Sequence, residues 1–227
     1  METYAEENER KIIEKYKELA ELENDEKKLI TACERLNALA IFYRRNRKYN
    51  EAIETYQEAI DIYGNLENSE GLGTKHGLSI CWNNLGNCYS DFNQADNALK
   101  AYQNALRIRY ELSKIDLIKY TPDTSMTLNA LGILYSKHNF LEEAEDCYLS
   151  ALNLRRMLFC SDEEKHVSDL TQSIVNLSTF YFMHIKKTQE SIELAKECIK
   201  LAEEFNTIPA MLQYKDTALS LLKINNR

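Results

Sequence analysis

Apolar residues recur along the chain at the three- and four-residue spacing of amphipathic α-helices, within a block that repeats every 46 residues. The block opens with a stretch such as Leu36–Tyr43, in which large apolar side chains share one helical face. It continues with a stretch in which small alanines flank a tyrosine, as in Ala98, Tyr102 and Ala105. The pattern predicts two helices per block, because alanine lets the second helix approach the first while the aromatic ring fills the space between repeats.

Four copies of this block are present. Their shared place is marked by Tyr43, Tyr89, Tyr135 and Tyr181, which are 46 residues apart each time. The first three copies align without gaps, whereas the fourth, which begins at Ile174, is degenerate and contains one inserted residue before its second helix. We therefore expect an all-α chain of antiparallel helix pairs.

Several residues indicate where helices approach, begin or stop. Gly86 and Gly132 stand at equivalent places inside first helices, where glycine costs about 1 kcal/mol relative to alanine, so we expect close helix–helix contact there. The stretch from Gly64 to Gly77 holds four of the six glycines and is expected to be a flexible loop. Pro122 is expected at a first helical position, and Ser161 with Glu164 is expected to form a capping box.

Both ends of the repeat array are expected to carry a capping helix. An acidic amphipathic helix over 2–23 and a final helix over 208–224, starting near Pro209, would cover the end faces. The predicted organisation is a single solenoid over residues 1–227. Its parts are a capping region at 1–32, repeats at 33–78, 79–124 and 125–170, a degenerate repeat at 171–206 and a capping helix at 207–227.

The repeated positions (Trp or Leu, Leu, Gly or Ala and Tyr, then Ala, Tyr and Ala) resemble the tetratricopeptide repeat, TPR. The usual unit has about 34 residues, so these 46-residue units are similar to the long repeats of kinesin light chains and of bacterial multi-repeat arrays. The resemblance implies a right-handed superhelical solenoid whose first helices line a concave groove. It also implies a non-catalytic scaffold or adaptor that binds a peptide or helix of a partner protein there.

The candidate groove residues are those beside the core positions of the first helices, because neighbours of a buried stripe emerge on the adjacent face. They are Asn37, Ile41, Arg44, Arg45, Asn83, Asn84, Asn87, Ser90, Asn129, Ile133, Lys137, Asn176 and Thr179. Asparagines recur at the repeat period, and their amides can donate to and accept from a bound peptide backbone. The alternative is that these amides are solvated or bond locally between neighbouring helices.

A basic cluster at Arg44, Arg45, Arg47 and Lys48 could attract an acidic partner segment, with arginine gripping a carboxylate; the alternative is a solvated helix end. Some TPR domains hold acidic chaperone tails through a Lys/Arg/Asn clamp. Asn37 stands in place of the first lysine of that clamp, so this activity is not carried over.

Composition and motifs exclude several classes of function. The net charge of −8 disfavours nucleic-acid binding, and no apolar run long enough for a transmembrane helix occurs. The charged N-terminus lacks a signal-peptide pattern, so we expect a cytoplasmic protein. The six cysteines and four histidines lack metal-site spacing, and no enzyme motif is present, so neither cofactor nor catalysis is expected.

Two other functions remain open from the sequence. The chain could be a regulatory subunit of a larger bacterial assembly of the protease or defence type, as suggested by similar long-repeat arrays. It could also form homo-oligomers in which the acidic helix 2–23 of one copy fills the groove of another.

Overall fold

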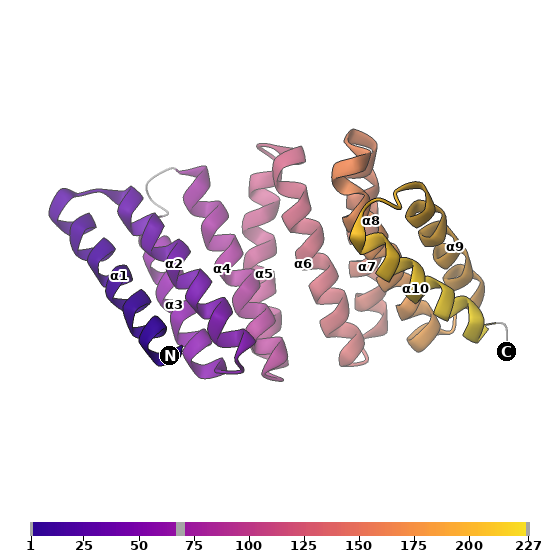
Figure 1. The fold of residues 1–227 in the computed structure, drawn as a ribbon, viewed down its shortest axis with the longest axis horizontal. Coiled ribbons are helices and arrows are strands. Elements are labelled where there is room, and N and C mark those ends of the chain that lie inside the picture. Colours follow the sequence, from indigo (N-terminus) through magenta and orange to yellow (C-terminus); the bar gives the residue numbers. More distant parts are fainter. Residues whose placement is uncertain (1, 67–70, 226–227) are drawn as a thin grey trace. The chain divides into compact units, whose positions relative to one another are not determined.

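The computed structural model describes residues 2–66 and 71–225, and within these ranges every regular element is a helix (Figure 1). Residue contacts divide the chain into two compact units, Met1–Ile115 and Asp116–Arg227, and each unit is described by itself. No helix in the described ranges combines the length and the apolar character needed to cross a membrane.

The first unit is a layer of five helices. Its elements are α1 (Glu2–Glu23), α2 (Glu26–Arg45), α3 (Tyr49–Leu66), α4 (Leu72–Asp91) and α5 (Ala95–Ser113). α2 with α3 and α4 with α5 form antiparallel pairs, and α3 packs on α4 while α1 packs on α2. Helix α1 thus lies where the sequence predicted an N-terminal helix.

The second unit repeats this arrangement. Its elements are α6 (Leu117–Lys137), α7 (Leu141–Ser161), α8 (Glu163–Phe180), the π-helix η1 (Tyr181–Ile185), α9 (Thr188–Glu204) and α10 (Pro209–Asn225). α6 pairs with α7, α8 pairs with α9, and α10 packs on both α8 and α9. The final helix begins at Pro209, as expected from the fixed φ that suits proline to a first helical position.

The turns inside the helix pairs reverse the chain through one left-handed residue. Arg47, Asn93 and Asn139 have φ values of 61°, 58° and 63° and follow the 46-residue period. In the fourth pair this residue is Lys186, with φ of 59°, one position later than the period requires. The π-helix η1 explains the shift, because each π turn takes one more residue than an α turn, and so absorbs the insertion.

Close contact between a glycine and a tyrosine ring holds the two helices of a pair together. A β-carbon added to Gly86 would lie 2.6 Å from Cδ1 of Tyr102, and one added to Gly132 would lie 2.9 Å from Cδ1 of Tyr148. Both tyrosines are buried. The glycines therefore stand where the sequence predicted a close approach, and the ring occupies the space of a side chain.

The prediction of a loop from Gly64 to Gly77 is wrong for most of these residues, because they lie in helices. Gly64 lies inside α3, and Gly73 and Gly77 lie inside α4, while residues 67–70 are outside the described ranges. A β-carbon on Gly77 would lie 2.5 Å from the hydroxyl oxygen of Tyr63, so this glycine serves packing rather than chain flexibility.

Two predicted helix starts also need correction. Pro122 lies inside α6, which begins at Leu117 after the N-cap Asp116, whose side chain accepts from the Lys119 amide. The N-cap of α8 is Asp162, which accepts from the Lys165 amide, whereas the Ser161 hydroxyl donates to the Leu158 carbonyl. The aspartates are the better caps because an ionised carboxylate also interacts favourably with the positive end of the helix dipole.

Replacing Gly86 with alanine is expected to destabilise the protein by about 1–3 kcal/mol, because the new methyl group meets the Tyr102 ring inside a packed interface. The matched change at Gly64, where no atom lies within 4 Å of the added β-carbon, should stabilise it by up to about 1 kcal/mol through helix propensity. Urea unfolding followed by circular dichroism measures both. Equal effects at the two sites would contradict the packing role of Gly86.

Candidate functional site

Successive first helices are joined by pairs of asparagines. In the first unit, Nδ2 of Asn84 on α4 donates to Oδ1 of Asn37 on α2 over 3.0 Å. In the second unit, Nδ2 of Asn176 on α8 donates to Oδ1 of Asn129 on α6, also over 3.0 Å. These amides thus bond locally between neighbouring helices, which is the alternative that the sequence left open.

Two of the predicted groove residues are buried. Asn83 is 2% exposed and Asn129 is 7% exposed, so the expectation that they emerge at the surface is wrong. Asn83 accepts a hydrogen bond of 3.3 Å from Nη1 of Arg109, a fully buried arginine on α5. At this repeat position, Asn83 accepts from a buried arginine, whereas Asn37 and Asn129 accept from asparagines of the next first helix.

Sequence reasoning missed the buried arginines, although Arg109 and Arg155 are one 46-residue period apart. Arg155 on α7 is 3% exposed, and its Nη1 donates to the Asp169 carbonyl over 2.6 Å and to Oγ of Ser173 over 3.0 Å. Its Nε donates to Oγ of Ser125 over 3.3 Å. Burial lowers the pKa of Arg155, and the neutral acceptors offset part of the cost of enclosing the charge.

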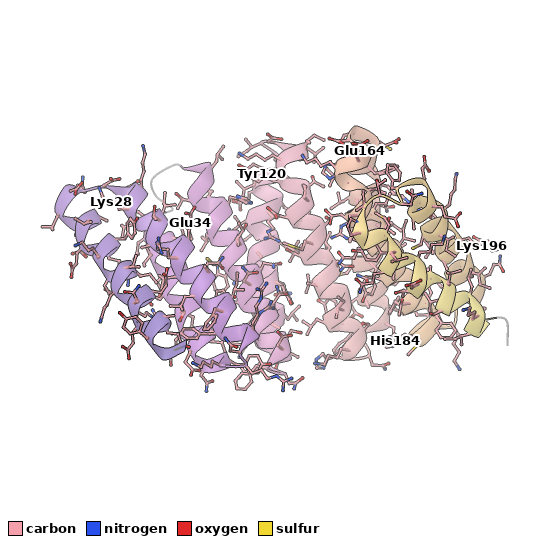
Figure 2. All side chains as sticks on the ribbon, in the orientation of Figure 1. Lys28, Glu34, Tyr120, Glu164, His184 and Lys196 are labelled. Carbon is pink, nitrogen blue, oxygen red and sulfur yellow. The ribbon has the colours of Figure 1, made fainter. Side chains whose placement is uncertain are left out.

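A hollow of 230 Å³ in the second unit gathers several predicted residues. Its lining residues come from α6, α7, α8 and η1, and they are Ile133, Ser136, Tyr148, Asn176, Thr179, Phe180 and His184. Ile133, Asn176 and Thr179 belong to the predicted groove set and come together here. His184 (labelled in Figure 2) was not among the predicted groove residues, because its position depends on the π-helix that absorbs the insertion.

Aromatic rings form one side of this hollow. The centre of the Phe180 ring lies 5.2 Å from that of the Tyr148 ring and 5.6 Å from that of the His184 ring. The planes of the Phe180 and His184 rings are 28° apart, so these two rings are stacked. Ile133 is 48% exposed although it is a large aliphatic residue. The hollow therefore offers apolar contact area at the surface of the second unit.

The polar groups of the hollow offer mainly acceptor atoms. The hydroxyl of Ser136 donates to the Ile133 carbonyl over 3.1 Å, and that of Thr179 donates to the Val175 carbonyl over 2.8 Å. The Asn176 amide nitrogen donates to Asn129, so its side-chain oxygen retains acceptor capacity. Such a set suits a ligand that brings N–H donors together with an apolar side chain.

A second hollow, of 310 Å³, lies between α2, α3 and α4 in the first unit. It is lined by Ile30, Glu34, Asn37, Tyr63, Gly73, His76, Gly77, Ile80 and Cys81, and Glu34 is labelled in Figure 2. Of the predicted residues it includes only Asn37. Ile41, Asn84, Asn87 and Ser90 are half-buried elsewhere on α2 and α4, and the Asn87 side-chain oxygen accepts from the Tyr102 hydroxyl over 2.8 Å.

The basic cluster is partly neutralised within the first unit. Nη1 of Arg44 lies 3.5 Å from Oδ2 of Asp91, and Nζ of Lys48 lies 2.7 Å from Oε1 of Glu6. Arg45 and Arg47 are exposed at the end of α2, and Lys137 is exposed at the end of α6. Two of the four clustered bases are thus engaged with acids of this chain.

Four of the six cysteines, Cys33, Cys81, Cys88 and Cys198, are buried, where a thiol packs as a small apolar group. Burial raises the pKa of Cys33 to about 12, and it raises that of Cys88 and of Cys147 to about 11. A thiol with so high a pKa is a poor nucleophile near neutral pH. Within the described ranges, no three His, Cys, Asp or Glu side chains are grouped so that they could hold a metal ion.

Helix α1 is engaged within its own chain. Nη1 of Arg10 lies 2.6 Å from Oε2 of Glu58, Nη1 of Arg35 lies 2.7 Å from Oε1 of Glu9, and Lys17 also pairs with Glu58. Burial alone would raise the pKa of Glu58, but hydrogen bonds from Lys17 and Arg10 outweigh it and lower that pKa. This packing gives no support to the alternative in which the acidic helix fills the groove of another copy.

Comparison with known proteins identifies the same repeats. Models of the tetratricopeptide repeat match residues 31–111 and 124–159, which together span just over half of the chain. A candidate kinesin light chain from Podosopora anserina with nearly identical TPR-like repeats has a TM-score of 0.62 at 18% identity, covering 84% of this chain and 85% of its own. A single-substitution variant of it has a TM-score of 0.59 at 18% identity, covering 84% and 91%. No curated protein matches the chain.

Replacing Asn83 with alanine is expected to destabilise the protein by about 1–3 kcal/mol, because Arg109 loses a buried hydrogen-bond acceptor. The control is Asn153→Ala on α7, at an exposed position, which should change stability by less than about 0.5 kcal/mol. Guanidinium unfolding of the two variants makes the comparison. A neutral Asn83→Ala would show that the Arg109 contact contributes nothing.

The tyrosines Tyr56 and Tyr102 are one repeat apart but differ in their hydrogen bonding. The Tyr102 hydroxyl donates to Asn87, whereas the buried Tyr56 hydroxyl has no hydrogen-bond partner among the described residues. We expect Tyr102→Phe to cost about 1 kcal/mol and Tyr56→Phe to be neutral or stabilising. Thermal unfolding measures the pair, and a larger loss at Tyr56 would contradict this assignment.

Proposed function

Because the chain belongs to the tetratricopeptide repeat family, whose repeats mediate protein–protein interactions, we propose that it is a non-catalytic scaffold that binds a segment of a partner protein between α6 and α8. The observation that carries the proposal is the hollow of 230 Å³ in which Ile133, Asn176 and Thr179 come together.

The chemistry of the hollow describes the segment that it would bind. An apolar side chain of the partner contacts Ile133 and Phe180, where burial of aliphatic and aromatic surface supplies affinity. N–H groups beside that side chain donate to the oxygens of Asn176, Thr179 and Ser136. An extended peptide meets both needs, because its backbone amides alternate with its side chains.

The contacts within each unit do not favour binding of an acidic tail, because they already engage the groups that would donate to its carboxylates. The hollow's hydroxyls already donate to carbonyls of their own helices, and Arg44 in the first unit lies against Asp91. Affinity is therefore expected to depend on apolar contact more than on salt concentration.

Selection of peptides from a random library on the immobilised protein tests the proposal. Changing Ile133 to lysine should raise the dissociation constant of the selected peptides at least about tenfold, since loss of an anchor contact costs more than about 1 kcal/mol of binding free energy. The control is Ile41→Lys, which alters the equivalent half-buried position of the first repeat and should leave affinity within about twofold. Titration calorimetry measures both variants. Peptides that bind Ile133→Lys as tightly as the parent protein would overturn the proposed site.

A further inference from the structure

The hollow of 310 Å³ between α2, α3 and α4 stands at the repeat position of a buried arginine. Tyr63, which lines it, is followed at the 46-residue period by Arg109 and Arg155, both of them buried. The degenerate fourth repeat, counted with its inserted residue, has Ala202 at this position. The second and third repeats thus enclose a guanidinium of their own, and the first repeat has none.

The surroundings of the Arg155 guanidinium identify the corresponding place in the first repeat. Its Nη1 donates to the Asp169 carbonyl over 2.6 Å, to Oε1 of Gln172 over 3.2 Å and to Oγ of Ser173 over 3.0 Å. Two periods earlier, the equivalents of these three acceptor residues all line the hollow, and they are Gly77, Ile80 and Cys81. The hollow therefore corresponds to the place that a guanidinium occupies in the third repeat.

An acid without a partner lines this hollow. Glu34 (labelled in Figure 2) is exposed, and its carboxylate forms no ion pair or hydrogen bond with a described residue. The same position in the other repeats holds uncharged residues, namely Ile80, Met126 and Gln172. Burial is the main cause that raises the pKa of Tyr63, and the negative charge of Glu34 adds to it. None of the described lining residues is a lysine or an arginine, so the hollow favours a cation from outside.

Neutral groups of the hollow suit the rest of an arginine side chain. Oδ1 of Asn37 accepts one hydrogen bond from α4 and keeps a second lone pair. Its repeat equivalent Asn83 accepts from Nη1 of Arg109 over 3.3 Å, so an amide at this position can bind a guanidinium. Ile30 on α2 and Ile80 on α4 offer apolar contact for the methylene groups of a long side chain.

We propose that this hollow binds the guanidinium of an arginine on a partner protein. The guanidinium donates to the Glu34 carboxylate and to Oδ1 of Asn37, while its methylene groups contact Ile30 and Ile80. Arginine fits better than lysine, because its planar group directs several N–H donors to separate acceptors, whereas an ammonium is a compact point charge. The site is distinct from the hollow between α6 and α8, so the inference goes beyond the proposed function and does not rest on it.

NMR titration of the full isotope-labelled chain with short peptides tests the proposal. The probe is an acetylated and amidated alanine–arginine–alanine peptide, and its matched controls carry lysine or citrulline, which has nearly the shape of arginine without the charge. We expect the arginine peptide to shift the amide signals of Asn37 and Ile80 and to bind at least about threefold more tightly than either control. Titrations are run at about pH 8, above the range in which histidine ordinarily titrates, because His76 also lines the hollow.

Two pairs of variants locate the binding. Glu34→Gln should weaken the arginine peptide at least about threefold, whereas Glu21→Gln, which removes an exposed acid of α1, should leave its affinity within about twofold. Gly73→Leu extends a side chain into the hollow from a position where a β-carbon has no atom within 4 Å, and should weaken binding at least about fivefold. Gly64→Leu on α3, with an equally open β-carbon, should leave binding within about twofold. Circular dichroism checks that the variants are folded.

Equal affinity for the arginine and citrulline peptides would overturn the proposal. A lysine peptide that binds as tightly as the arginine peptide, or no binding of the arginine peptide up to about 10 mM, would do the same. Binding that neither Glu34→Gln nor Gly73→Leu weakens would place the arginine elsewhere and contradict the assigned site. A dimer in sedimentation that Gly73→Leu dissociates would also overturn it, since the occupant would then be a second copy of the chain.

Discussion

The close approach of a first helix to the tyrosine of its own second helix is the constraint on which the second and third repeats depend. Gly86 and Gly132 leave only the space that the rings of Tyr102 and Tyr148 fill. Gly77 makes a comparable approach to Tyr63, which belongs to the preceding second helix. Because packed interiors tolerate little change in volume, these contacts fix how the helices lie against each other within each unit. The positions of the asparagines, arginines and hollows follow from that arrangement.

Buried polar side chains occupy the remaining space between the helices. Arg109 and Arg155 are enclosed with neutral acceptors, including Asn83, Ser125 and Ser173. Hydrogen bonds offset part of the cost of burying these charges, and one acceptor recurs with the arginines: Ser79 accepts from Nε of Arg109, and Ser125, one period later, accepts from Nε of Arg155. Among the periodic asparagines, Asn83 accepts from Arg109, and Asn37 and Asn129 accept from neighbouring first helices, so periodicity alone does not identify residues that contact a partner.

The helices, the family and the all-α fold were predictable, because the period of 46 residues and the helical spacing of apolar residues are properties of the sequence itself. The site was predictable only in part. Ile133, Asn176 and Thr179 line the hollow of the proposed site and were among the residues predicted from register, whereas the place of His184 depends on the π-helix, which no local pattern indicates. The loop predicted at Gly64–Gly77 was wrong because Gly64, Gly73 and Gly77 lie inside helices, and residue type alone does not distinguish a glycine in a helix from one in a turn.

The hollow that carries the proposed function arises where a repeat departs from its neighbours. In the fourth repeat, one inserted residue changes the end of the first helix and brings His184 beside Phe180. In the first repeat, Phe42 is 37% exposed, whereas Cys88 and Phe180 at the same repeat position are buried. A regular repeat satisfies its own apolar and polar groups through its neighbours. The proposed site accordingly lies where one inserted residue interrupts that regularity.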